Sequence, residues 1–435
     1  MYTNLVSFVG TNGDSPIGTL VQGRDGNLYG VTQMGGAFGG GTVFKLVRDG
    51  TLTTLASFDI TNGCGPHAGL VQGSDGSFYG TETFGGVYTD QAGLGCGAVF
   101  KITPEGLLTN LALLNETNGA HPSAELVEGT DGSFYGTTTD GGQYGYGTAF
   151  KVTPAGEFTC LVSFNLSSTS GYQPWGPLSP GDNGSFYGTT RAGGSCGCGS
   201  LFQMTPEGAL DTLVSFSCTN GVGSMFALVR GADGSWYGAG DGGGAYGLGM
   251  IYRVTPKGEV STTASFSGTN GELPRGLTQA ADGNFYGMTA YGGIGYNGQM
   301  FSGYGTIFEA TPAGVITSLI SFTNDDWAFG GLLQANDGSF YGMTRHGGDY
   351  GHGRVFRLSV PMAPVCRVMA QAGNTVSLTW SAVAGQTYQV QFSTNLGQTN
   401  WLNLGSPVTA TDGTAAASAV IESDPQRLYR VVLLP

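Results

Sequence analysis

A six-residue motif recurs seven times along this chain, and no other feature constrains its fold as strongly. Each copy is an Asp-Gly or Asn-Gly pair, a variable residue, an aromatic residue or Leu, and then Tyr-Gly; the copies begin at residues 25, 75, 131, 183, 233, 282 and 337. The tyrosines of the first and last copies, Tyr29 and Tyr341, are six repeats apart, so the mean period is about 52 residues. A period of this length is typical of propellers and other repeat folds.

Each repeat contains four short segments with strand character. An apolar segment such as 68–73 precedes the two-residue turn, the aromatic segment follows it, and segments such as 41–45 and 54–58 come next. Long helices are excluded, because 80 of the 435 residues are Gly and each interior Gly costs a helix about 1 kcal/mol relative to Ala. Four antiparallel strands per repeat predict an all-β chain built from propeller blades.

The N-terminal residues match the strand that the last repeat lacks. The seventh repeat ends at Arg357 after three strands, whereas residues 4–8 resemble the fourth strand of the other repeats. A strand from Leu5 to Phe8 paired with Val355 and Phe356 removes both exposed sheet edges. We therefore expect residues 1–360 to form a seven-bladed β-propeller closed by its N-terminal strand.

Residues 361–435 lose the repeat and its glycine density. Strand-like segments at 375–380, 387–393, 401–404 and 428–434 alternate with turns, and Trp380 is the expected core residue. This pattern predicts a small β-sandwich that resembles a fibronectin type III-like module.

The repeats carry a family resemblance over residues 1–360. Their shared core, G-L-V-x-G-x-D-G-x-[FL]-Y-G-x-T-x-x-G-G followed by G-T-[VA]-F-K, resembles the GloVer tandem repeats of bacterial surface and secreted proteins. The resemblance implies an extracellular or cell-surface protein and transfers no catalytic residues. The opening residues MYTNLVSF lack the basic and apolar regions of a signal peptide, so we expect a mature or trimmed N-terminus.

The net charge of −14 and the lack of any Lys or Arg run exclude nucleic acid as a partner. No stretch has the 18 apolar residues of a membrane helix, so no membrane insertion is expected. We also expect no cofactor, no metal site and a monomer.

In each repeat, one loop leads into the first strand and another connects the second strand to the third strand. These loops form one rim of the propeller, called here the loop rim, and we expect the functional residues there. Seven residues, the channel-mouth residues, occupy one repeat position at the start of the first strand: Ile17, His67, Ser123, Trp175, Met225, Arg275 and Phe329. A structural position repeats around such a ring, so this variety predicts a surface free to specialise, although drift in unused loops looks the same.

Aromatic residues follow the Gly-Gly pair in most repeats: Phe38, Tyr88, Tyr144, Tyr246, Tyr296 and Tyr350. They either pack between neighbouring loops or, with Trp175 and Trp327, form platforms on which sugar rings stack. We therefore take Tyr88, Tyr296, Tyr350, Trp327 and the channel-mouth residues His67, Trp175, Arg275 and Phe329 as the ligand-binding candidates. The motif tyrosines and the aromatic residues before them are expected to pack between blades.

Acid, base and cation candidates lie where the second strand meets the loop rim: Glu82, Asp140, Arg191, Asp241, Arg345 and His346. Carboxylates facing each other across the channel suit glycoside hydrolysis, and an Arg-His pair suits a lyase that neutralises a uronate. Otherwise these side chains are solvated polar groups of the rim.

Cys64 and Cys96 belong to the same rim of the second repeat, so we expect a disulfide between them and an oxidising compartment. Either Cys196 or Cys198 is placed to reach Cys218; a metal site at Cys196 and Cys198 is disfavoured because no His is near.

Three functions remain open on this evidence. The first is a secreted or cell-surface propeller that binds a glycan or other surface ligand without catalysis. The second is a glycoside hydrolase or polysaccharide lyase with its site over the channel, and the third is a scaffold for another protein.

Overall fold

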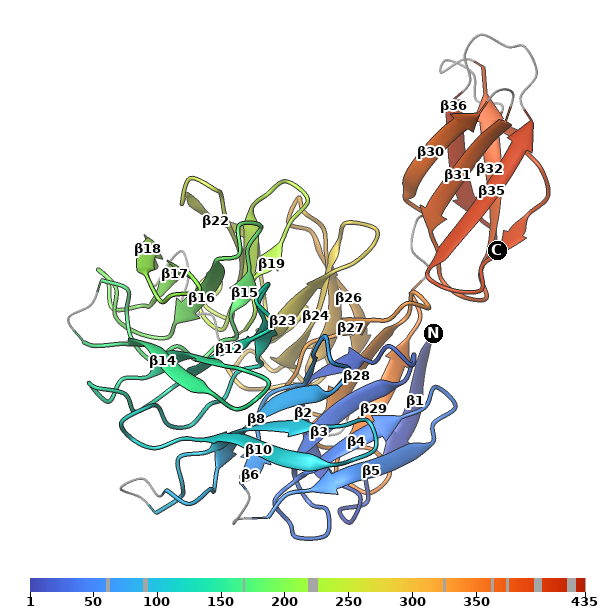
Figure 1. Ribbon diagram of the computed structural model, residues 1–435. Helices are drawn as coiled ribbons and strands as arrows, with labels where there is room; N and C mark the ends of the chain where they lie inside the picture. Colours follow the sequence, from blue (N-terminus) through green and yellow to red (C-terminus); the bar gives the residue numbers. More distant parts are fainter. Residues whose placement is uncertain are drawn as a thin grey trace.

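The computed structural model describes residues 1–59, 63–88, 93–166, 169–217, 226–323, 326–360, 364–372, 375–394, 401–420 and 428–434. Over these residues every regular element is a β-strand and no helix occurs, so the predicted all-β class is confirmed. Figure 1 shows a large body of sheets from residues 2–358 and a smaller body that follows it, drawn in red.

Seven antiparallel sheets are found in the described part of residues 2–358, each in the order first, second, third and fourth strand. The first strands are β2 (Asp14–Gln22), β7 (Val71–Gln72), β11 (Val127–Glu128), β15 (Ser179–Pro180), β19 (Val229–Arg230), β23 (Glu272–Gln279) and β27 (Leu333–Gln334). The second strands are β3 (Leu28–Met34), β8 (Phe78–Phe84), β12 (Phe134–Thr138), β16 (Phe186–Thr190), β20 (Trp236–Gly240), β24 (Phe285–Tyr291) and β28 (Phe340–Thr344).

The third strands are β4 (Thr42–Leu46), β9 (Ala98–Ile102), β13 (Thr148–Val152), β17 (Ser200–Met204), β21 (Met250–Val254), β25 (Thr306–Ala310) and β29 (Arg354–Leu358). The fourth strands are β5 (Leu52–Ser57), β10 (Leu108–Leu113), β14 (Phe158–Ser163), β18 (Leu210–Ser215), β22 (Val260–Ser265), β26 (Ile316–Ser321) and β1 (Tyr2–Ser7). The second sheet has a fifth strand, β6 (Cys64–Pro66), which also pairs with β8.

Neighbouring sheets are held together by the motif tyrosines. In six of the seven sheets the tyrosine lies against the aromatic residue one position earlier in the motif of the next sheet, as Tyr79 does on Phe134 with ring centroids 3.8 Å apart. Five further pairs repeat this contact: Tyr29 with Phe78, Tyr135 with Phe186, Tyr187 with Trp236, Tyr237 with Phe285, and Tyr286 with Phe340. Tyr341 of the seventh sheet shares a buried cluster with Leu28 of the first sheet. The expected packing between sheets is confirmed.

The same tyrosines anchor the turn that precedes them. The Tyr29 hydroxyl donates a hydrogen bond of 2.8 Å to Asp25, which also forms an ion pair of 2.8 Å with Lys45 of the third strand. The hydrogen bond and the cation hold the pKa of Asp25 below its usual range, although its partial burial acts the other way. This turn joins the first three strands of a sheet and recurs with Asp75, Asp131, Asp233 and Asp337.

The N-terminal strand completes the seventh sheet. β1 pairs antiparallel with β29, with Asn4 opposite Phe356 and Val6 opposite Val355. Phe8, just beyond β1, is fully buried in the cluster shared by the seventh and first sheets. The predicted pairing of the chain's first strand with Val355 and Phe356 is therefore confirmed.

The smaller body contains two sheets. β30 (Cys366–Ala372), β31 (Thr375–Ser381) and β35 (Thr414–Val420) form one, and β32 (Thr387–Ser393), β33 (Leu402–Asn403), β34 (Val408–Thr409) and β36 (Leu428–Leu433) form the other. They share a core in which Trp380 is fully buried, as expected. This body contacts the turn of the seventh sheet, where Ala384 N–H donates to the Asp337 carbonyl at 2.9 Å.

Deleting residues 1–9 is expected to lower the melting temperature sharply, because it exposes the edge of β29 and removes Phe8, whose burial alone is worth about 3–5 kcal/mol. Differential scanning calorimetry measures the change. Val9→Ala, at a residue with an exposed side chain just after the strand, is the control and should melt like the wild type. An unchanged melting temperature in the deletion variant would contradict the role assigned to β1.

Candidate functional site

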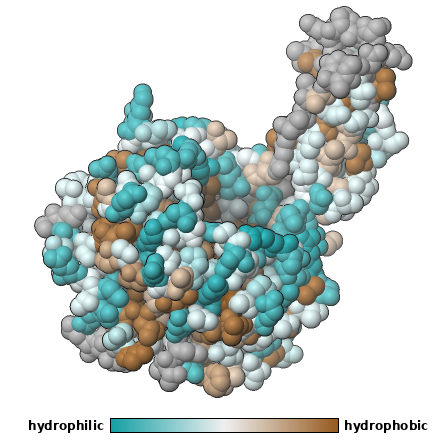
Figure 2. Space-filling model, viewed as in Figure 1, coloured by the Kyte–Doolittle hydropathy of each residue, from teal (hydrophilic) through white to brown (hydrophobic). Residues whose placement is uncertain are grey.

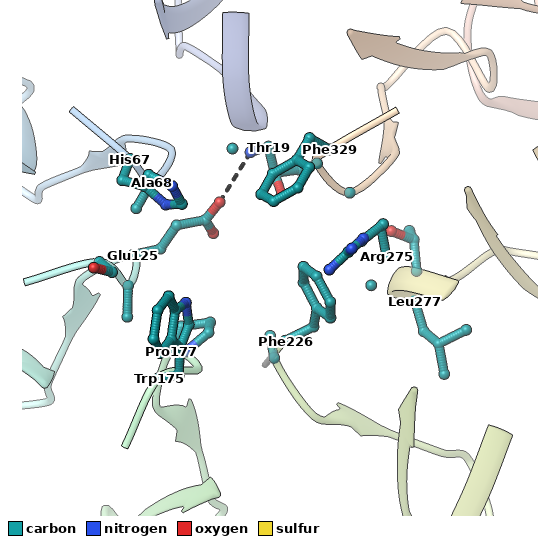
Figure 3. Close-up of a pocket in the computed structure, with 18 residues that line it drawn as sticks. Thr19, His67, Ala68, Glu125, Trp175, Pro177, Phe226, Arg275, Leu277 and Phe329 are labelled. Atoms are coloured by element: carbon teal, nitrogen blue, oxygen red, sulfur yellow. Dashed lines mark hydrogen bonds between the residues drawn. The ribbon is translucent and has the colours of Figure 1, made fainter. Parts of the chain in front are cut away.

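The channel-mouth residues line one cavity at the centre of the seven sheets. His67, Ser123, Trp175, Arg275 and Phe329 belong to five different sheets and all border a cavity of about 400 Å³. Figure 3 shows His67, Trp175, Arg275 and Phe329 arranged around this space. Its size is within the range of small-molecule sites. Met225 lies outside the described residues, and Ile17 is buried in the core between the first two sheets.

The wall of the cavity differs from sheet to sheet, because glycine residues bring three of the sheets into close backbone contact. A Cβ atom on Gly18 would collide with the backbone of Gly69, and one on Gly330 would collide with the backbone of Gly18. The seventh, first and second sheets therefore touch through their backbones at this level. The larger side chains of the cavity come mainly from the remaining sheets, as Trp175, Phe226 and Arg275 do.

Glu125 ties the third sheet to the first two across this channel. Its carboxylate Oε1 accepts hydrogen bonds from the backbone N–H of Thr19 at 3.0 Å, drawn dashed in Figure 3, and of Gly69 at 3.3 Å. Burial raises the pKa of this carboxyl group, whereas the N–H donors act to lower it. Glu125 thus closes one side of the cavity and places a carboxyl group there.

Arg275 provides a buried cation in the opposite wall. Its guanidinium group lies over the rings of Phe226, at 5.6 Å from the centroid, and of Phe329, at 4.7 Å. Its Nη1 lies 3.5 Å from Asp241 Oδ2. Asp241 belongs to the loop after β20, and burial raises its pKa while Arg275 and Arg191 act to lower it.

Arg191, Asp241 and Arg345 occupy one repeat position, four residues after the motif tyrosine, and they lie next to the cavity residues. Arg191 lies over the Trp175 ring at 5.3 Å and Arg345 over the Phe329 ring at 5.6 Å. Arg345 also donates a 2.7 Å hydrogen bond to Gln33 of the first sheet. Three of the predicted polar residues are therefore brought together with the predicted channel-mouth residues.

His67 is an uncharged base in this environment. Its ring makes an edge contact with Phe329, with centroids 6.1 Å apart. Burial, helped by the positive charge of Arg345, lowers the pKa of His67 to about 4. The imidazole is therefore neutral at pH 7.

Glu82 lies away from the cavity, contrary to the expectation that it faces the channel. It precedes the repeat position of Arg191 by one residue, and strand alternation turns its side chain to the other face of the sheet. It is fully buried next to Gly63, and burial raises its pKa well above the usual value. A carboxyl group in that position cannot act across the channel.

Asp140 and His346, one residue beyond the Arg191 position, are also absent from the cavity wall. Asp140 Oδ2 lies 3.1 Å from His121 Nδ1, and this hydrogen bond lowers the pKa of Asp140. The His346 ring instead contacts Trp327 at 5.7 Å, and Trp327 contacts Tyr291 at 5.6 Å. This aromatic cluster adjoins the cavity through Arg345, whose N–H donates to the Trp327 carbonyl at 2.8 Å.

The aromatic residues after the Gly-Gly pairs are not part of the cavity wall either. Tyr88 and Tyr350 are at least half exposed, and Tyr296 packs beside Gly268. These loops are attached to the outermost strand of a sheet: Asp349 N–H donates to Ser7 Oγ of β1 at 3.1 Å. Tyr88 and Tyr350 are therefore exposed rim residues, and their role as sugar platforms remains a prediction.

No disulfide joins Cys64 to Cys96, so this prediction was wrong. Cys64 lies beside Gly40 of the first sheet. Cys96 packs with Leu114 and Ala120 on the side of the third sheet. The two residues share a rim but lie on opposite sides of the second sheet. The expected partner Cys218 lies outside the described residues.

Phe226 and Glu125 were missed by the sequence argument, which compared only the channel-mouth position. At the next repeat position Phe226 stands where the other sheets have Gly or Ala. At the position after that, Glu125 is the only charged residue. Phe226 and Glu125 each differ from the residues at the same position in the other repeats, and this difference is the sequence signal that identifies them.

The described part of the chain shows neither a metal-binding cluster nor a membrane-spanning helix. No three His, Cys, Asp or Glu side chains gather there as metal ligands would. Among the described residues there is also no helix long and apolar enough to span a membrane.

Comparison with protein families places the chain in the Gloeobacter/Verrucomicrobia repeat family, whose model matches residues 1–94 and 84–301. The chain belongs to this family, and the resemblance to GloVer repeats is confirmed. A comparison with curated proteins found no match.

Solved structures resemble the chain at low identity. An inactive virginiamycin B lyase from Staphylococcus aureus, with quinupristin, is 14% identical over 83% of this chain and 99% of its own, with a TM-score of 0.58. A fungal alcohol oxidase in complex with copper is 13% identical over 100% of this chain and 92% of its own, with a TM-score of 0.54. This likeness shows the fold alone, which is of the propeller type.

The neutral His67 makes the protein sensitive to acid. A pKa lowered from 6.5 to about 4 on folding contributes stability above pH 6.5 that is lost as the pH falls toward 4, up to about 3 kcal/mol in all. Between pH 7 and pH 4 the free energy of unfolding should therefore fall further in the wild type than in His67→Gln, as measured by urea denaturation. His352→Gln, outside the cavity, is the control. Parallel pH profiles for the wild type and His67→Gln would contradict the buried neutral imidazole.

Proposed function

We propose that this member of the Gloeobacter/Verrucomicrobia repeat family is a seven-bladed β-propeller that binds a glycan in its central cavity. The seven sheets in chain order, the contact between the seventh and first sheets, and the pairing of β1 with β29 support the seven-bladed ring. The two sheets around Trp380 support a C-terminal β-sandwich of the fibronectin type III-like kind.

The observation that most directly supports glycan binding is the combination of aromatic and polar groups in the cavity wall. Trp175, Phe226 and Phe329 come from three different sheets, and Glu125 and Arg275 lie between them. Aromatic faces accept the C–H faces of a pyranose, while charged groups select its substituents. A sugar residue uses both kinds of contact, whereas a purely apolar ligand would leave the buried Arg275 Nε without a hydrogen-bond partner.

An extracellular or cell-surface location belongs to this proposal and is supported by the resemblance to surface and secreted repeat proteins. The Cys64–Cys96 pair no longer supports it, because these two residues are not bonded to each other. Cell fractionation of the native host with an antibody to the chain tests it.

A polysaccharide lyase is the second candidate, and the proximity of His67 to Arg345 favours it. A lyase needs a base that accepts a proton and a cation that neutralises a uronate, and His67 lies beside Phe329 with Arg345 close to both. Glycoside hydrolysis is less favoured, because Glu82 and Asp140 are absent from the cavity wall and the two carboxyl groups at the cavity are engaged by the protein. Asp241 is paired with Arg275, and Glu125 accepts hydrogen bonds from Thr19 and Gly69. Release of unsaturated sugars, followed by ultraviolet absorbance and abolished in His67→Gln, would identify the lyase.

Trp175→Ala is expected to weaken glycan binding about 30-fold, because removing an aromatic anchor costs about 2 kcal/mol or more. A glycan array run first on the wild type identifies the ligand, and titration calorimetry then compares the variants. Tyr246→Ala, at an exposed rim residue outside the cavity, is the control and should bind like the wild type. If the array gives no binding, glycan recognition is wrong; if Tyr246→Ala is the weaker binder, the site is at the rim.

A further inference from the structure

Arg275 is an unusual component of the cavity wall, because it is a cation held between two apolar rings. It belongs to β23, where it pairs opposite Met288, and about nine-tenths of its side chain is buried. The Phe226 and Phe329 rings fix the position of the guanidinium group. Figure 3 shows this group pointing toward the open centre of the cavity.

The hydrogen-bonding capacity of Arg275 is largely unused by the described residues. A guanidinium group has five N–H donors, and the ion pair to Asp241 at 3.5 Å is longer than the 2.7–2.9 Å usual for such contacts. The Arg275 Nε is buried and has no hydrogen-bond partner in the described part of the chain. Donors therefore remain for a ligand.

Two further cations lie close to Arg275, although the whole chain carries a net charge of −14. Arg345 lies against the same Phe329 ring, and Arg191 lies over Trp175. The carboxyl groups near these cations are Asp241, Glu125 and Asp14, and Asp241 Oδ2 lies 3.5 Å from Arg275 Nη1. A buried cation with incomplete pairing costs free energy, and an anionic ligand would offset that cost.

We infer that the cavity is specific for an acidic sugar and that the ligand's carboxylate binds to Arg275 while its ring lies against Trp175 and the two Phe rings. This inference rests on the proposed function and names its ligand class as uronic acid residues. The two oxygens of a carboxylate match the planar N–H fork of one guanidinium group. A phosphate monoester also fits the guanidinium fork, but the nearby carboxyl groups oppose its second negative charge. A sulfate ester carries a single charge, so a sulfated probe is needed to separate it from a carboxylate.

Titration calorimetry with matched ligands tests the inference on the wild-type protein. The probes are trisaccharides of glucuronate, galacturonate, mannuronate and guluronate, each paired with the trisaccharide of the corresponding neutral hexose, and a sulfated neutral trisaccharide. At least one uronate should bind tenfold or more tightly than its neutral partner.

Two substitutions should move this preference in opposite directions. Arg275→Gln should abolish it, Arg275→Lys should keep part of it, and Arg230→Gln, at a surface ion pair outside the cavity, should leave it unchanged. Asp241→Asn removes a competing carboxylate, so uronate binding should tighten several-fold while neutral sugar binding stays the same. If Arg275→Gln fails to fold, the acidic specificity is still tested by the uronate preference of the wild type and by the tighter uronate binding expected of Asp241→Asn.

The outcomes separate the two proposals. Equal binding of uronate and neutral sugars overturns the acidic specificity and leaves the proposed glycan site standing. Preference for the sulfated sugar overturns the carboxylate assignment. Binding of none of these sugars overturns both.

Discussion

The contact on which the whole ring depends is the stacking of motif tyrosines on the aromatic residue of the next sheet. It buries two large rings per interface, as Tyr79 and Phe134 do at 3.8 Å. The Tyr hydroxyl meanwhile reaches the Asp of its own turn. One dipeptide therefore fixes both the neighbouring sheet and the hairpin, which explains why the motif tolerates so little change. Because the contacts between sheets are nearly the same throughout, the residues at the start of the first strands are free to differ from sheet to sheet. Most of these differing residues line the cavity.

This division explains what could be predicted from the sequence. The sheets, their order and the packing of Tyr29 to Tyr341 follow from a period, and a position in the repeat translates directly into a position around the ring. For this reason His67, Trp175, Arg275 and Phe329 could be placed at one cavity before any coordinates were known. Glu82 was misplaced, because an offset of one residue along a strand reverses the face. The Cys64–Cys96 pair failed because a shared rim does not mean a shared side of the sheet.

Phe226 and Glu125 show the limit of comparing a single repeat position. In each sheet the side chain that enters the cavity comes from the channel-mouth position or from one of the two residues after it. Which of the three it is depends on the free space, and that space is set by glycine contacts between sheets, such as Gly18 with Gly69. The sequence shows that Phe226 and Glu125 depart from the repeat, but it does not show how much space the cavity leaves for their side chains. The same argument applies to Arg275, whose importance depends on two rings that come from other sheets.

The pairing of β1 with β29 joins residues about 350 positions apart. During synthesis β1 must wait for β29, which completes its sheet, and until then the first and last sheets each have an unpaired side. High contact order of this kind slows folding and leaves partly built chains prone to association through open edges. Each tyrosine stack, in contrast, forms between sheets that are adjacent in the chain. A chain that ends before residue 354 therefore lacks β29 and leaves β1 without the strand it pairs with.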